Sequence, residues 1–227
     1  MGTRDCPPMA RVASVLLTVM LSVLLGGLPG GLTTGCSDDD ATGPKDVLGP
    51  WPASEDSLMA LLRKAYADRD LDAYLSLLDD GYVFQYQQVD IDLLGLPSSY
   101  LDRAGEEDVA TNMFSGQPAP GGQPAISEIR WPVLEGVGPW EDSYNPSYPG
   151  CRRRVFNIMM EMDRPGDITL VIGGQQEFYV APCDTVLPGG SAATAWRMRA
   201  QVDLSESVPK GTERPTWGWV KATYRTP

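Results

Sequence analysis

The chain has 227 residues, a formal net charge of −12, four cysteines and no histidine. This length allows one domain with a short additional segment. The strong acidity argues against nucleic-acid binding, which requires a basic surface to neutralise phosphates. Because the chain has no histidine, a Ser-His-Asp or Cys-His mechanism and a histidine-containing zinc site are excluded. We predict no cofactor and no nucleic-acid partner.

Residues 1–35 have the pattern of an export signal. Arg4 and Arg11 form a basic start, and the uncharged apolar run VASVLLTVMLSVLLGGL follows from Val12. This run is close to the roughly 18 residues that cross a membrane, so an uncleaved anchor is one interpretation. Small residues just before Cys36 favour cleavage instead.

The string LTTGC, Leu32 to Cys36, resembles the lipobox of bacterial lipoproteins. The resemblance implies cleavage before Cys36 and acylation of this cysteine, which would anchor the chain to a membrane. The leucine lies one position further from the cysteine than in most lipoboxes, and cleavage without lipidation is the other interpretation. Ser37 resembles the residue that sorts such proteins to the outer membrane, so we expect an envelope protein that faces the periplasm.

Residues 36–53 are predicted to be a flexible acidic tether. The segment is rich in Asp, Gly and Pro and shows neither helical nor strand periodicity, which is typical of a linker. Its Asp38–Asp40 run is expected to be a solvated spacer, because the other spaced oxygen ligands of a calcium site are missing. The folded domain is therefore expected to span residues 54–227.

Two helices are expected to open the domain. Ser54 is a suitable N-cap, and apolar residues recur after it at helical spacing. Asp70 is expected to cap a second helix with an apolar face over residues 71–78. A third helix is expected over residues 101–115, with Asp102 as its cap.

The remainder of the domain is predicted to be β-structure. The sequence DRPGD is typical of a hairpin turn between two strands, and Gly173–Gly174 in the second strand indicates a bulge. Apolar and polar residues alternate after Thr194, which predicts a strand with one buried face. Helices followed by a long antiparallel sheet indicate an α+β fold. The expected strands are residues 82–89, 126–134, 152–162, 168–180, 194–204 and 216–224.

The segment from Leu58 to Phe84, LMALLRKAYADRDLDAYLSLLDDGYVF, resembles the opening of nuclear transport factor 2-like (NTF2-like) domains, also called SnoaL-like. The segments at Trp196 and Trp217 are similar to the end of the same domain. The resemblance covers about residues 54–226. It implies a cone, in which three N-terminal helices pack on a strongly curved antiparallel β-sheet around a pocket.

The family includes isomerases and cyclases as well as members without catalysis. In the isomerases an aspartate on the first strand is the general base; the resemblance places Gln85 there, and an amide cannot accept the proton. We therefore expect a non-catalytic module that binds a small molecule or acts as a scaffold. A SnoaL-like enzyme on a small hydrophobic substrate is the alternative, with Asp90, Asp92 and Glu177 as candidate carboxylates. A third interpretation is a protein-interaction module in an envelope complex, with a homodimer formed through the sheet.

Aromatic side chains are the candidate ligand-binding groups. In a cone of this kind they would line the pocket and hold an apolar ligand, with hydroxyl or indole N–H groups orienting it. Filling the core is the alternative role. The candidates are Tyr82, Phe84, Tyr86, Trp131, Trp196 and Trp217.

Two cysteines are candidates for a disulfide. Cleavage would remove Cys6 and lipidation would use Cys36, which leaves Cys151 and Cys183 in an oxidising compartment. They lie on opposite arms of the expected hairpin, at similar distances from the turn near Gly166. We expect a disulfide that contributes about 2–4 kcal/mol, with two buried thiols as the alternative.

Overall fold

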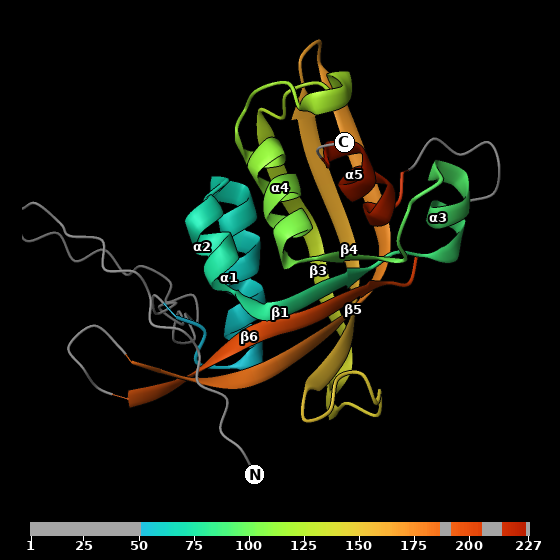
Figure 1. The fold of residues 1–227 in the computed structure, drawn as a ribbon. Coiled ribbons are helices and arrows are strands. Elements are labelled where there is room, and N and C mark those ends of the chain that lie inside the picture. The colour runs from blue at the N-terminus through green and yellow to red at the C-terminus, as the bar shows by residue number, and fades with distance from the viewer. Residues whose placement is uncertain (1–50, 187–191, 206–214, 226–227) are drawn as a thin grey trace, which may run out of the picture. The chain divides into compact units, whose positions relative to one another are not determined.

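A computed structural model describes residues 51–186, 192–205 and 215–225 (Figure 1). The predictions on residues 1–50, which include Cys36 and the export signal, lie outside this part of the chain. The described residues form an α+β fold, as predicted. Its helices are α1 (Glu55–Asp68), α2 (Leu71–Ser76), α3 (Gln88–Leu94), α4 (Arg103–Phe114), the 3-10 helix η1 (Pro120–Gly122) and α5 (Trp217–Tyr224). Its strands are β1 (Leu78–Gln85), β2 (Tyr100–Asp102), β3 (Glu128–Asp142), β4 (Arg152–Arg164), β5 (Ile168–Val186) and β6 (Ala192–Asp203).

The three predicted helix starts are confirmed. Ser54 and Ser57 form a capping box at α1, in which each hydroxyl accepts the other residue's backbone N–H, over 3.1 and 2.8 Å. The side chains of Asp70 and Asp102 each accept a backbone N–H three residues later, at the starts of α2 and α4. These caps satisfy amide groups that have no partner within the helix. Helix α3 was not predicted.

The sheet has the strand order β2-β1-β6-β5-β4-β3 (Figure 1). All neighbouring strands are antiparallel except β1 and β6, which are parallel. The sheet is therefore mixed and not purely antiparallel as predicted. The parallel pair arises because β6, the last strand in the chain, lies beside β1, the first. Figure 1 shows the sheet bending around α1, α4 and α5, which lie on one side of it. This arrangement agrees with the one that the NTF2-like resemblance implied.

The hairpin of β4 and β5 is confirmed, but the bulge predicted at Gly173–Gly174 is not in its ladder. The two strands pair without a register shift from their turn to Arg152, which lies opposite Val180. Gly174 has a φ of 159°, and a Cβ there would overlap the Ser205 side chain. Glycine at position 174 is therefore explained by the close approach of Ser205. The register shift in β5 lies instead between Tyr179 and Val180, in the pairing with β6.

The first two predicted strands, residues 82–89 and 126–134, correspond to β1 and β3 but differ from them in their bounds. β1 begins at Leu78, so residues 79–81 lie inside it, at a register irregularity against β6. β3 continues to Asp142 beyond Pro132, with two register shifts along its pairing with β4. Such irregularities bend a strand, and they accompany the curvature of the sheet.

The strand predicted over residues 216–224 is wrong, because this segment forms helix α5. Thr216 caps the helix, and its side chain accepts the backbone N–H of Trp219 over 2.9 Å. Apolar residues in a short segment fit a strand or a helix about equally well. The burial of residues three, four and seven positions apart on one face shows the helical period. These residues are Trp217, Val220, Lys221 and Tyr224.

The core lies between the helices and the inner face of the sheet. On β4, buried apolar residues from Phe156 to Met162 alternate with residues on the opposite face. That outer face carries ion pairs: Arg130 contacts Asp163 over 2.6 Å, and Arg153 contacts Glu177 over 2.6 Å. Within residues 51–186, 192–205 and 215–225, no helix is long and apolar enough to cross a membrane.

Candidate functional site

A fully buried ion pair joins α4 and α5 in the interior. The Lys221 Nζ contacts both carboxylate oxygens of Glu106, and both side chains are at most 1% exposed. The Tyr74 hydroxyl donates a hydrogen bond to Glu106 Oε1 over 2.5 Å. Burial lowers the pKa of Lys221, and the negative charge of Glu106 opposes this shift. Burial thus disfavours the charged ammonium, and the Glu106 carboxylate beside it favours that form.

Aromatic rings surround this ion pair. Lys221 Nζ lies 4.6 Å from the ring centre of Phe84 and 5.1 Å from that of Trp217. A cation over the face of an aromatic ring is attracted by the ring's quadrupole, most strongly where water is excluded. The ring of Tyr66 contacts both Tyr74 and Trp217, at 5.1 and 6.0 Å between centres. The result is a dry compartment with one carboxylate and several ring faces.

The six aromatic candidates come together in one core. Trp196 is partly buried against it, and the other five are 0–7% exposed within it: Tyr82, Phe84, Tyr86, Trp131 and Trp217. They belong to the packed core, and of the six only Tyr86 also lines the described cavity at β1 and β2. Three of their polar atoms are buried without a hydrogen-bond partner among the described residues, namely Tyr86 Oη, Trp131 Nε1 and Trp217 Nε1. The interior therefore contains polar groups that its packing does not satisfy.

Two further buried carboxylates hold the start of α5. Asp203 Oδ2 accepts the backbone N–H of Gly218 over 2.9 Å, near the positive end of the helix dipole. The hydroxyl of Thr216 contacts Asp90 Oδ2 over 2.7 Å, and Asp90 is 3% exposed. A Cβ at Gly218 would overlap the Asp90 carboxylate, so glycine is needed for this close approach.

The three carboxylates named from the sequence have different surroundings. Asp90 is buried at α5, as described above, whereas Asp92 is exposed and accepts a hydrogen bond from Gln88. Glu177 lies on the outer face of the sheet, where it contacts Arg153 over 2.6 Å. The sequence analysis missed the buried pair partner Glu106. Its spacing of three, four and seven residues from Val109, Ala110 and Met113 is the signal that would have placed it on the buried face.

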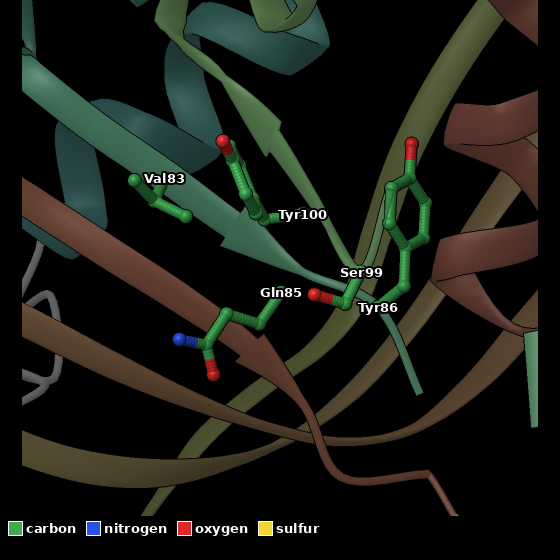
Figure 2. A pocket seen from close by; sticks show the side chains of 5 residues that line it. All are labelled: Val83, Gln85, Tyr86, Ser99 and Tyr100. Carbon is green, nitrogen blue, oxygen red and sulfur yellow. The ribbon is translucent and has the colours of Figure 1, made fainter. Parts of the chain in front are cut away.

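A cavity of about 300 Å³ lies at the junction of β1 and β2. Figure 2 shows Gln85 and Tyr86 pointing away from each other, as neighbours on a strand do. Gln85 Nε2 donates to the Tyr148 hydroxyl over 2.7 Å. Gln85, which the resemblance placed at the position of an isomerase base, therefore points to the side opposite Tyr86. The cavity is lined by Val83, Gln85, Tyr86, Ser99 and Tyr100.

Cys151 and Cys183 are both buried, 5% and 7% exposed. Arg152 lies opposite Val180, so Cys151 would come opposite Ala181 if the register continued, with Cys183 two residues further along β5. The disulfide between the two cysteines stays a prediction. Among the residues that the structure describes, no group of three or more side chains is arranged to hold a metal ion.

No protein-family model and no curated protein matches this chain. It is similar to the solved beta subunit of benzoate 1,2-dioxygenase from Burkholderia mallei, at 15% identity and a TM-score of 0.42, over 66% of this chain and 89% of that one. A conserved protein from Planctomyces limnophilus has 7% identity and a TM-score of 0.44, over 65% and 90% of the two chains. A protein from Kribbella flavida has 10% identity and a TM-score of 0.44, over 67% of this chain and 88% of that one. At these identities the likeness concerns the fold alone.

We expect the Asp90 carboxyl to titrate above its ordinary pKa of 3.8, because burial disfavours the charged form and Asp203 adds repulsion. The hydrogen bond from Thr216 acts in the opposite direction. Since the pKa is higher in the folded than in the unfolded state, the folded state binds this proton more tightly. The contribution of Asp90 to stability is therefore present at low pH and is lost as the pH rises through the folded-state pKa.

The measurement is denaturant unfolding of the wild type and of Asp90→Asn over a pH series from about 4 to about 8. We expect the wild type to lose more stability than the variant as the pH rises. Two parallel pH profiles would contradict the prediction. A direct check is the chemical shift of the Asp90 carboxyl carbon over the same series.

Proposed function

We propose that this chain is a membrane-anchored, extracytoplasmic NTF2-like module that binds or scaffolds and does not catalyse a reaction. The observation that carries this proposal is the position of α5 in the interior of the curved sheet. Its side chains Trp217 and Lys221 are 1% and 0% exposed, and they contact Glu106 of α4 and Phe84 of β1. Helix α5 therefore occupies the side of the sheet on which an NTF2-like pocket would open.

The chemistry of the interior supports a module over an enzyme. A general base must reach a proton of the substrate, but each buried carboxylate already has partners within the chain. Glu106 binds Lys221 and Tyr74, whereas Asp90 and Asp203 hold the first turn of α5. These groups position a helix, which is a structural role.

The surface of the domain favours small-molecule binding over a homodimer through the sheet. The outer face carries the ion pairs of Arg130 and Arg153, and burying such charges in an interface has a high desolvation cost. The cavity beside Gln85 and Tyr100 has a volume of about 300 Å³, at the lower end of the range for small-molecule sites. An amide, hydroxyl groups and an exposed tyrosine ring would be available to a ligand there.

The anchoring part of the proposal depends on the lipobox-like string that ends at Cys36. The packed domain begins at or before Pro52, whose carbonyl accepts the backbone N–H of Trp196 over 2.8 Å. Residues 37–51 separate the two, and fifteen residues reach at most about 54 Å when fully extended. The proposed tether would thus keep the domain close to the membrane surface.

The test compares wild type with Cys36→Ala in a bacterial host that exports the chain with its own leader. We expect wild type in the membrane fraction with the mass of an acylated Cys36, because acyl chains provide stable anchoring. Cys36→Ala is expected in the soluble envelope fraction. The matched control is Cys6→Ala, which should remain anchored. A Cys36→Ala variant that stays in the membrane, or a wild type without lipid mass, would refute the anchor.

A further inference from the structure

The cavity at the junction of β1 and β2 has an uncharged lining. Its residues, shown in Figure 2, are Val83, Gln85, Tyr86, Ser99 and Tyr100. Gln85 and Tyr100 lie directly opposite each other on the two antiparallel strands, so their side chains are on the same face of the sheet. Tyr100 is 53% exposed, so the cavity is open to solvent beside its ring. A ligand can therefore enter without a change in the fold.

The polar groups of this cavity have hydrogen-bonding capacity that the folded domain does not use. The Gln85 amide donates one N–H to the Tyr148 hydroxyl over 2.7 Å. Among the described residues, no hydrogen-bond partner is present for the Gln85 oxygen, for its second N–H or for the Tyr100 hydroxyl. An amide oxygen accepts hydrogen bonds and an amide N–H donates them. The cavity therefore suits a ligand that both donates and accepts.

The uncharged lining narrows the class of this ligand. An ion would find no opposite charge in the lining to compensate for the hydration that it loses. A purely apolar ligand would displace water from the Gln85 amide and leave its oxygen and N–H without a partner, which is costly. A neutral ligand with several hydroxyl groups avoids both costs, because each hydroxyl donates and accepts a hydrogen bond.

The ring of Tyr100 adds a requirement on the shape of the ligand. The face of an aromatic ring is partly negative and attracts the slightly positive hydrogens of C–H groups. A pyranose sugar with equatorial hydroxyl groups has C–H groups on its faces and hydroxyl groups around its rim. One face of such a sugar can cover the Tyr100 ring while its rim reaches Gln85, which lies opposite on β1.

We propose that this cavity binds a neutral pyranose sugar with equatorial hydroxyl groups. Tyr100 contacts the face of the sugar ring, and Gln85 exchanges hydrogen bonds with its hydroxyl groups. The volume of about 300 Å³ is at the lower end of the range for small-molecule sites, which suits a single sugar ring. This inference rests on the small-molecule binding of the proposed function, whose ligand class it names, and does not depend on the membrane anchor.

The experiment titrates the full chain with methyl β-D-glucopyranoside, cyclohexanol and phenol, and follows the side-chain signals of Gln85 and Tyr100 by NMR. A detergent without a sugar headgroup keeps the apolar run after Val12 in solution and supplies no competing saccharide. We expect the glucoside to bind saturably with a dissociation constant on the order of 1 mM, because a small ligand in an open cavity makes few contacts. Cyclohexanol has one hydroxyl on a ring of the same size and should bind about tenfold more weakly.

Variants test the two contacts separately. Tyr100→Ala should weaken binding of the glucoside about three- to tenfold, because the ring face is lost. Tyr100→Phe keeps the face and should bind within about twofold of wild type. Gln85→Leu should weaken binding about three- to tenfold, because the amide hydrogen bonds are lost. The matched control is Tyr144→Ala, which removes a tyrosine that is 74% exposed and contacts Arg153 outside the cavity; it should bind as wild type.

The thermal midpoint of each variant verifies its fold, and the exposure of Tyr100 makes its replacement the more robust test. A glucoside that moves neither set of signals, that binds Tyr100→Ala as tightly as wild type, or that binds no better than cyclohexanol would overturn the proposal. Binding of phenol or cyclohexanol in this cavity without the glucoside would overturn the sugar and leave small-molecule binding standing. Binding of none of the three would overturn the sugar and contradict small-molecule binding at this cavity, whereas the membrane anchor is decided by Cys36→Ala.

Discussion

Replacing Glu106 with Gln is expected to lower the free energy of unfolding by about 3–5 kcal/mol. The substitution keeps an oxygen that can accept the Tyr74 hydrogen bond but removes the charge that compensates Lys221. Because both members of the pair are at most 1% exposed, water cannot replace the lost carboxylate. An unpaired buried charge is among the most destabilising changes in a protein core.

The pH dependence of this variant identifies the cause of the loss. Burial lowers the pKa of Lys221, and without Glu106 nothing in the ion pair opposes that shift. A lysine with a lower pKa in the folded state contributes stability above its unfolded pKa and loses it as the pH falls through the folded pKa. Glu106→Gln should therefore regain stability as the pH rises towards 10.5, the ordinary value for lysine.

The matched control is the double variant Glu106→Gln with Lys221→Met. Removing both charges of a buried pair is often close to neutral, whereas removing one is not. We expect the double variant to recover most of the loss, measured by urea unfolding as part of a double-mutant cycle. A single-variant loss below about 1 kcal/mol would show that the pair is solvated in the molecule.

Replacing Trp217 with Ala is expected to lower the free energy of unfolding by about 3–5 kcal/mol, as for other buried tryptophans. The side chain is 1% exposed, and its ring packs against Tyr66 and the Lys221 ammonium. Its loss leaves a cavity and weakens the attachment of α5 to the interior. For a domain of this size, we expect the thermal midpoint to fall by roughly 10 °C.

Trp219→Ala is the control on the same helix. Two residues apart on a helix, Trp217 and Trp219 point about 200° apart, whereas on a strand they would share one face. Trp219 is only partly buried, so its replacement should have a clearly smaller effect, about 1–2 kcal/mol. Equal losses for the two variants would indicate a strand and contradict the helix.

Local rules were enough wherever a residue acts through its nearest neighbours in the chain. Ser54, Asp70 and Asp102 cap the helices that follow them, because a side-chain oxygen reaches an amide only two or three residues away. The β4–β5 hairpin follows from its turn residues in the same way. These features depend on contacts that are short in sequence.

The candidate site depends on contacts that are long in sequence. Glu106 and Lys221 are 115 positions apart, and an acidic residue in the first turn of a helix is ordinarily a surface residue. Asp90 and Thr216 are 126 positions apart. No pattern of neighbouring residues therefore indicates the hydrogen bond that joins them at the start of α5. For the same reason the sequence could not decide whether the aromatic residues fill a core or line a pocket.

The sequence by itself determined the α+β order, the helix starts, the hairpin and the acidic charge balance. Only the tertiary structure decided that residues 217–224 form a helix, because WGWVKATY has apolar residues that suit either period. The helix is favoured by contacts with α4 and β1, in which Lys221 pairs with the buried carboxylate of Glu106 and lies over the ring of Phe84. A strand could not present Trp217, Val220, Lys221 and Tyr224 to the same interior, and a helix does.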